Sequence, residues 1–121
     1  MANINFQNVH TMIGADAIVA GSIDLQEGII IYGNVQGDVT SFGPVRVAKG
    51  AIVYGNIFGS DIQISGQVTG NVTAKGQVIL GEESVLKGDI IYQKLHIEDG
   101  AKFEGKCDLV SPNQTDRKSV V

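Results

Sequence analysis

The chain has 121 residues, a formal net charge of −4, 43% apolar residues and sixteen glycines against two prolines. That apolar fraction is typical of one folded domain, and the abundance of valine and isoleucine favours strands over helices. The chain offers neither the basic stripe with stacking aromatics that nucleic acids require nor a run of ~18 apolar residues that could span a membrane. The composition therefore predicts one all-β domain that does not bind nucleic acid.

The charged residues and the single cysteine indicate where such a domain works. Residues 1–45 carry four acids and no lysine or arginine, whereas residues 46–121 carry nine acids and nine bases. Cys107 cannot form an internal disulfide, and the N-terminus lacks the basic region and apolar core of a signal peptide. We expect a cytoplasmic protein whose N-terminal half is acidic.

In chain order, residues 1–10 form a short N-terminal arm, and a repeated pattern then occupies residues 11–109. One unit has an apolar residue, a small or acidic turn, an apolar residue, a glycine and another apolar residue, as in Val47–Ile57 and Leu80–Ile90. A second unit lies between the copies of the first, at residues 29–39 and 62–72. Each unit returns after about 33 residues and the two alternate, so the elementary coil has roughly 16–18 residues.

This repeat predicts a single-stranded parallel β-helix. Short strands place alternate side chains inward, and a glycine takes the corner where a Cβ would be penalised. Three strands close a coil of triangular cross-section, and stacking places valine on valine and isoleucine on isoleucine. About six coils use the chain up to residue 109. Residues 110–121 lose the alternation, contain Pro112 and are predicted to be a flexible tail.

Three stretches of the repeat carry a family resemblance. They are Thr11–Asp16 with Gly21–Ile23, Gly66–Ala74, and Gly88–Ile90 followed by Leu95–Gly105. In this order they resemble the bactofilins, the bacterial polymer-forming cytoskeletal family, and the resemblance covers nearly the whole chain. It implies a right-handed β-helix that assembles without nucleotide into filaments. It further implies binding to the inner face of the cytoplasmic membrane and a scaffold role in cell shape or in recruiting cell-wall-related proteins.

The expected polymer contact consists of Phe103, Leu86 and Phe6. Phe103 is the aromatic residue at the inward position of the last coil, where earlier units have Val53 and Leu86. It is either a plug of the core or, by resemblance to the last-coil phenylalanine of bactofilins, a polymer contact. Independently of the family, a β-helix ends in unpaired backbone groups, and no capping helix is predicted at either end. End-to-end stacking into a filament is therefore the physical default.

Several apolar residues lie where the alternation points outward. They are Ile18, Ile30, Tyr32, Ile52, Tyr54, Phe58, Ile91 and Tyr92. Ile18, Ile52 and Val85 occupy equivalent places in the repeat, so stacked coils would align them into one face. Such a face predicts lateral association or contact with a membrane, and the alternative is ordinary scattered exposure.

The N-terminal arm contains Met1, Ile4 and Phe6, which resemble the membrane-targeting arm of the family. No lysine or arginine accompanies them, so anionic lipid would add no electrostatic attraction. The arm is therefore interpreted either as a membrane arm or as a leader without such a role.

The chain presents no catalytic or cofactor-binding constellation. His10 and His96 belong to opposite ends of the predicted solenoid and cannot converge on one site. Cys107 takes the place of Ile57 and Ile90 in the repeat, which predicts a buried, unreactive thiol. The glycine-rich stretches lack the Lys-Ser/Thr pair of a phosphate loop. We expect a structural protein without enzymatic activity, metal, cofactor or nucleotide.

Two alternatives belong to other functional classes. Hexapeptide-repeat acyltransferases are also β-helical, and Val19, Leu25 and Ile31 follow a six-residue spacing, but Gly37 and Gln63 stand where an apolar residue is required. A polysaccharide-binding module would present a ladder of aromatic side chains, for which three tyrosines are few. Assays of acyl transfer and of glycan retention separate both alternatives from a scaffold.

Overall fold

The computed structural model describes residues 9–109, which form eighteen short strands. No helix occurs among these residues, so the predicted all-β fold is confirmed. The first strand begins at Val9, slightly ahead of the expected start of the domain at residue 11. Most of the expected arm and all of the expected tail, residues 110–121, lie outside the described residues.

Three parallel sheets of six strands each form the faces of a solenoid. Sheet A consists of β1 (Val9–Ile13), β4 (Gly28–Ile31), β7 (Val45–Val47), β10 (Ile62–Ile64), β13 (Gln77–Leu80) and β16 (Lys94–Ile97). Sheet B consists of β2 (Ile18–Ala20), β5 (Asn34–Gln36), β8 (Ile52–Tyr54), β11 (Gln67–Thr69), β14 (Val85–Lys87) and β17 (Lys102–Glu104). Sheet C consists of β3 (Ile23–Leu25), β6 (Val39–Ser41), β9 (Ile57–Gly59), β12 (Val72–Ala74), β15 (Ile90–Tyr92) and β18 (Cys107–Leu109).

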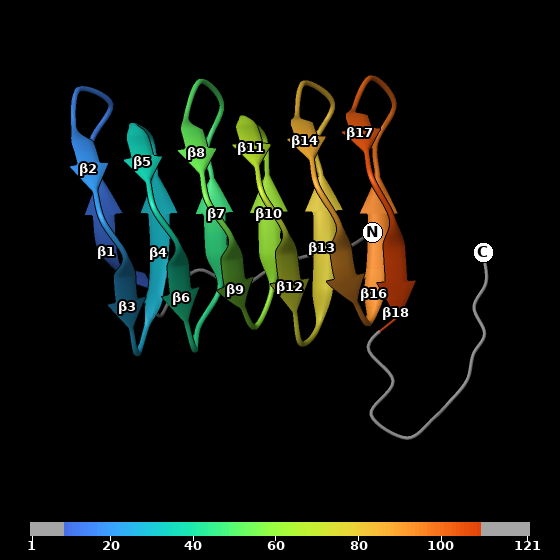
Figure 1. Cartoon of the computed structure of the whole chain (residues 1–121), viewed down its shortest axis with the longest axis horizontal. Coiled ribbons are helices and arrows are strands. Elements are labelled where there is room, and N and C mark those ends of the chain that lie inside the picture. Colours follow the sequence, from blue (N-terminus) through green and yellow to red (C-terminus); the bar gives the residue numbers. More distant parts are fainter. Residues whose placement is uncertain (1–8, 110–121) are drawn as a thin grey trace.

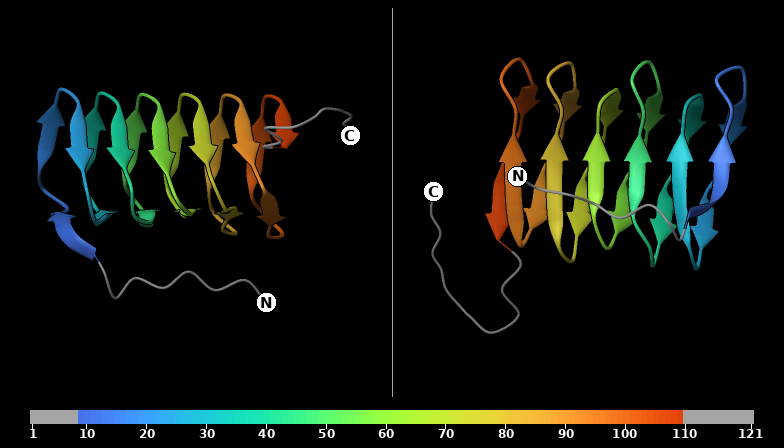
Figure 2. Two further views of the ribbon diagram at one scale, coloured as in Figure 1. Left: turned by 90° about the horizontal axis from the view of Figure 1, so that it is seen from below. Right: turned by 180° about the vertical axis from the view of Figure 1, so that it is seen from behind.

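Each turn of the chain gives one strand to each sheet, so coil 1 is β1–β3 and coil 6 is β16–β18. The coils stand side by side along the long axis (Figure 1), and the views from below and behind show the same stack from its other sides (Figure 2). Pairing follows the repeat, with Val45, Ile62 and Val78 in one register of sheet A. The predicted six-coil solenoid is therefore confirmed.

The core is a set of ladders inside the three sheets. Strands of sheets A and C point their first and third residues of each triplet inward, as in Ile62 and Ile64, whereas strands of sheet B point only the middle residue inward, as in Val68. Side chains without exposed surface include Ile29, Ile31, Val35, Val39, Val45, Val47, Val53, Ile62, Ile64, Val72, Val78, Leu80, Leu86 and Ile90. Burying one such side chain stabilises the fold by about 1.5–3 kcal/mol.

The corner between sheets B and C holds the coils at their closest approach. Gly37, Gly55, Gly70 and Gly88 adopt positive φ there, and a Cβ on Gly70 would overlap the carbonyl oxygen of Gly55. An aspartate or asparagine follows each of these glycines. In this ladder a backbone N–H donates to the Oδ1 of the preceding coil, as from Asn71 to Asn56 at 2.9 Å.

The corner between sheets A and B alternates between two forms from coil 1 to coil 5, which explains why the sequence repeats over two coils rather than one. In coil 3 it is a long turn in which the Ala51 N–H donates to the Ala48 carbonyl at 3.0 Å. In coil 4 it is short, and a Cβ on Gly66 would overlap the Ala51 carbonyl of that turn. Coils 1, 3, 5 and 6 have the long form, visible as rounded loops beside β2, β8, β14 and β17 (Figure 1).

Candidate polymerisation surfaces

The C-terminal end of the solenoid is an uncovered layer of core. Its inward side chains are Leu95, Ile97, Ala101, Phe103, Cys107 and Leu109, carried by β16, β17 and β18. Ile97 is 45% exposed, although the earlier members of its ladder are buried, and Leu109, which pairs with the partly buried Tyr92, is 57% exposed. Among the described residues no further strand pairs with β16, β17 or β18, so this end offers apolar surface together with the hydrogen-bonding edges of three strands.

Phe103 is the inward residue of β17 in this layer. It pairs with Leu86 of the preceding coil, packs against the core and remains partly exposed. Leu86 itself has no exposed surface. Of the three expected contact residues, Phe103 can meet another subunit directly, whereas Leu86 supports it from within. Phe6 lies outside the described residues.

Two residues near this end differ from the expectation. Cys107 stands in register with Ile90 as predicted, but it is exposed, so the expected burial was wrong. Partial burial of the thiol raises its pKa above the ordinary value, and the charges of Asp108 and Asp89 add to this shift. Tyr92, expected to point outward, is partly buried against the core, and burial raises the pKa of its hydroxyl.

The N-terminal end also leaves core side chains incompletely covered. Ala17, Val19, Ile23 and Leu25 are partly buried hydrophobic residues that pack against the core from coil 1. Asp16, Asp24 and Glu27 are exposed on the same coil. This end therefore combines apolar and acidic surface. Met1 and Ile4, the other residues of the expected membrane arm, lie outside the described residues.

The expected lateral face is divided among the three sheets. Ile18 and Ile52 do occupy one row of sheet B, but Asn34 stands between them, and Gln67 separates Ile52 from Val85. Ile30 lies on sheet A, Tyr32 at the end of β4, and Phe58 and Ile91 on sheet C. Their placement corrects the expectation of one continuous apolar face. Within sheet B, Ile18 is 68% exposed and Tyr54 is 55% exposed.

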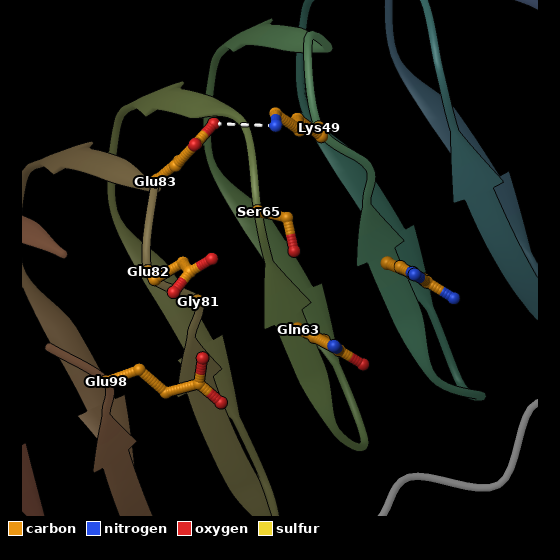
Figure 3. Close-up of a pocket in the computed structure, with 8 residues that line it drawn as sticks. Lys49, Gln63, Ser65, Gly81, Glu82, Glu83 and Glu98 are labelled. Carbon is orange, nitrogen blue, oxygen red and sulfur yellow. Dashed lines mark ion pairs between the residues drawn. The ribbon is translucent and has the colours of Figure 1, made fainter. Parts of the chain in front are cut away.

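A polar hollow lies beside the long corners of coils 3 and 5 (Figure 3). It measures about 370 Å³ and is lined by Arg46, Lys49, Gln63, Ser65, Gly81, Glu82, Glu83 and Glu98. Lys49 Nζ and Glu83 Oε1 form an ion pair at 3.0 Å across it, and the hydrogen bond to Glu83 raises the pKa of Lys49. Within residues 9–109, no group of three or more histidine, cysteine or acidic side chains is arranged to hold a metal ion. The ion pair in the hollow thus links coils 3 and 5, and the lining residues do not form a metal centre.

Comparison with known proteins identifies the family. The family model for bactofilins, described as polymer-forming cytoskeletal, matches residues 11–108. The chain belongs to the bactofilin family. A structure described as Thermus thermophilus bactofilin double helical filaments has a TM-score of 0.79 and 29% identity, covering 83% of this chain and 99% of that chain. The cytoskeletal bactofilin BacA, determined by solid-state NMR, has a TM-score of 0.74 and 30% identity, covering 87% and 99%.

Family membership confirms the resemblance drawn from the sequence motifs, and it places the chain in a structural cytoskeletal family. No curated protein matches the chain in sequence. In the part of this bactofilin chain that the structure describes, no helix is long and apolar enough to cross a membrane. Because the family is polymer-forming, the two ends with exposed core side chains are the candidate contacts between subunits.

Sequence reasoning missed part of the C-terminal surface. It identified Phe103, but it gave no role to Ile97 and Leu109. Their ladder partners in coil 5 are the fully buried Leu80 and the partly buried Tyr92. The available signal was their place in the last copy of the repeat. An inward residue of that copy has no further coil above it, so the end of the pattern identifies the exposed layer.

Proposed function

We propose that this chain is a cytoplasmic scaffold that assembles end to end into filaments without nucleotide. The observation that supports the proposal most is the uncovered layer of core around Phe103. Stacking a second subunit on this layer buries apolar side chains and offers partners to the backbone groups of β16, β17 and β18. Repeating such contacts at both ends of each subunit produces an open polymer.

The energetics of stacking require no nucleotide. Burial of apolar surface releases about 25 cal/mol per Å², and each end exposes several large side chains. Backbone hydrogen bonds across the junction would continue the pattern that already joins the six coils. Subunit concentration and salt, rather than hydrolysis, would then set the filament length. Salt matters because the exposed acids of coil 1 repel one another if like ends meet.

We further propose that the filaments associate laterally, as the relative described as double helical filaments does. Recruitment of cell-wall-related proteins and peripheral contact with the membrane belong to the same proposal. Membrane contact would use Met1, Ile4 and Phe6. Co-sedimentation with vesicles of zwitterionic and of anionic lipid tests it, and Ile4→Ser with Phe6→Ser should abolish the binding. Equal sedimentation of this variant and the wild type would reject the arm as the anchor.

The decisive experiment compares Phe103→Arg with the wild type by negative-stain microscopy in nucleotide-free buffer. A guanidinium in the C-terminal layer would lose its water on stacking without gaining a partner, so short, folded species are expected. Phe58→Arg is the matched control because Phe58 points outward from the middle of sheet C. Circular dichroism verifies that all three fold. A monodisperse wild-type monomer would reject the proposal, and long filaments from Phe103→Arg would remove Phe103 from the contact.

A further inference from the structure

The outer surface of sheet B differs from those of the other two sheets. In sheets A and C the middle residue of each triplet points outward, as Gln63 does between Ile62 and Ile64. In sheet B the middle residue points inward, as Val68 does, so Gln67 and Thr69 both point outward. Each coil therefore adds two neighbouring outward side chains to sheet B. The result is an outer face of two parallel rows.

The two rows share one pattern in five of the six coils. The first row is Ile18, Asn34, Ile52, Gln67, Val85 and Lys102. The second row is Ala20, Gln36, Tyr54, Thr69, Lys87 and Glu104. Both rows are apolar in coils 1 and 3 and uncharged polar in coils 2 and 4. In coil 5 they differ, because Val85 is apolar and Lys87 is charged. In coil 6 they carry opposite charges.

This match in five of the six coils makes most of the face complementary to itself. We propose that, within filaments, sheet B packs on sheet B of a second copy of this chain, about a two-fold axis parallel to the solenoid. That symmetry sets the first row of one subunit opposite the second row of the other, coil against equal coil. Ile52 then faces Tyr54, Asn34 faces Gln36, and Lys102 faces Glu104. Each of these contacts occurs twice.

The opposite orientation fits the same residues less well. If the second solenoid ran antiparallel with all six coils overlapping, Ile52 would face Gln67 and Asn34 would face Val85. Each such contact desolvates an amide against an apolar side chain without providing a hydrogen bond. A shift by one coil restores apolar contacts, but it leaves Lys102 and Glu104 without their partners. The parallel arrangement sets Val85 against Lys87 in coil 5 but matches the rows in the other five coils, so it satisfies more of the face.

The size of the face limits where the pairing occurs. Six strands at about 4.8 Å spacing, each about 10 Å long, give roughly 300 Å² per subunit. A stable dimer needs about 800 Å² per partner. Isolated subunits therefore do not pair, whereas two filaments that present many such faces in line bind by multivalency. The inference rests on the filaments of the proposed function. It specifies that sheet B is the face through which two filaments pair and that the paired solenoids run parallel.

Tyr54→Lys tests the face. The added charge lies in coil 3 of the second row, opposite Ile52 of the partner. It should separate the filaments while leaving the ends of each subunit unchanged, so single filaments of wild-type length are expected. Thr73→Lys on the outside of sheet C is the matched control and should leave pairs intact. Paired filaments from Tyr54→Lys would overturn the proposal. Single filaments from the wild type would overturn the pairing alone, and absence of any filament would also overturn the proposed function.

Cross-linking tests the orientation. In a Cys107→Ser background, filaments mixed from Asn34→Cys and Gln36→Cys subunits should be joined by a short bifunctional thiol reagent, because these positions face each other in the parallel pair. Subunits that also carry Phe103→Arg should lose the cross-link, since they do not form filaments. Stronger cross-linking between Asn34→Cys and Val85→Cys would show the fully overlapping antiparallel pair, and stronger cross-linking between Asn34→Cys and Gln67→Cys would show the antiparallel pair shifted by one coil. Either result would overturn the orientation.

Discussion

Coils 4 and 6 are built from the same kind of unit, yet they expose their inward side chains very differently. Val68 in coil 4 is 1% exposed, whereas Phe103, two coils further along the same ladder, remains partly exposed. Coil 4 has a neighbour on each side, and coil 6 has one. In a solenoid, burial is therefore a property of stacking rather than of the residue type. Any coil at the end of a stack would expose its inward side chains. In coil 6 the exposed inward side chains are apolar, so a stacked subunit would bury them.

The corners show the same contrast in the backbone. Gly21 and Gly70 both adopt positive φ, at 125° and 145°, but only Gly70 lies against an earlier coil. A Cβ added to Gly21 meets nothing within 4 Å, while one added to Gly70 overlaps the Gly55 carbonyl oxygen. The two positions separate the strain of the backbone conformation from the contact between coils.

The largest effect is expected from Gly70→Ala. The variant must separate two coils as well as adopt an unfavourable φ, so its free energy of unfolding should fall by more than about 3 kcal/mol. Gly21→Ala suffers only the backbone strain and should lose about 1–2 kcal/mol. Urea denaturation followed by circular dichroism measures both. Equal losses at the two positions would show that close stacking at this corner contributes nothing.

A smaller difference is expected between Leu86 and Phe103, which adjoin in one ladder. Leu86→Ala opens a cavity in the closed core and should lower the free energy of unfolding by about 3 kcal/mol. Phe103→Ala removes a side chain that is partly in water, so the monomer should lose less, while filament assembly should suffer more. Denaturation of dilute protein measures the stability of the monomer, and sedimentation of concentrated protein measures filament assembly. A greater loss of monomer stability from Phe103→Ala would identify this residue as a core plug.

The ladder of corner side chains allows a finer comparison. Asn71 Oδ1 accepts a hydrogen bond from the Asp89 N–H at 3.0 Å, whereas Lys106, at the equivalent place in coil 6, has no oxygen to offer a further coil. Asn71→Ala should lower the free energy of unfolding by about 1 kcal/mol, the usual contribution of such a bond. Lys106→Ala is the control and should change little. If thermal denaturation gives the same shift for both, the ladder is not a source of stability.

The sequence predicted the coil, the number of coils and the place of Phe103, because all three follow from the period of the repeat. It failed at Tyr92 because the three members that precede it in that inward ladder, Ser41, Gly59 and Ala74, are small. Such small residues give no apolar signal, so the ladder resembled a corner. The structure shows why they are small, since a Cβ on Gly59 would approach Val45 Cγ2 to 2.9 Å.

The repeat also could not predict that the outward apolar residues are distributed over three sheets. The spacing correctly made Ile18 and Ile52 equivalent, but the period of about 33 residues skips every second coil. Asn34, in the skipped coil, belongs to the other unit and was not compared with them. The asparagine and aspartate ladder had a readable signal, because Gly-Asp or Gly-Asn occurs at each of its corners, for instance at residues 55–56 and 70–71. Its meaning required the hydrogen bonds between coils.

The smallest expected effect is chemical and concerns Cys107, which occupies in coil 6 the place of Ile90 in coil 5. Partial burial raises the pKa of this thiol, and the charges of Asp108 and Asp89 raise it further, because both disfavour the thiolate. The rate of iodoacetamide alkylation should therefore be slower at neutral pH than in the denatured chain, and should rise with pH only above the ordinary thiol range. The neutral thiol also stabilises the fold below that range, and this contribution is lost as the pH rises through the raised pKa.

A cysteine placed at the equivalent position of coil 5 allows the alkylation rates of coils 5 and 6 to be compared. Ile90→Cys in a Cys107→Ser background places the sulfur under a complete coil, so it should resist alkylation at every pH at which the protein stays folded. Asp108→Asn should move the Cys107 profile toward lower pH by removing one of the two charges. Filament assembly should then slow Cys107 further, because a stacked subunit would give coil 6 the cover that coil 5 already has. Equal rates for Cys107 in filaments and in Phe103→Arg monomers would mean that the C-terminal layer stays open in the polymer, and that the difference between the last coil and the others is not used for assembly.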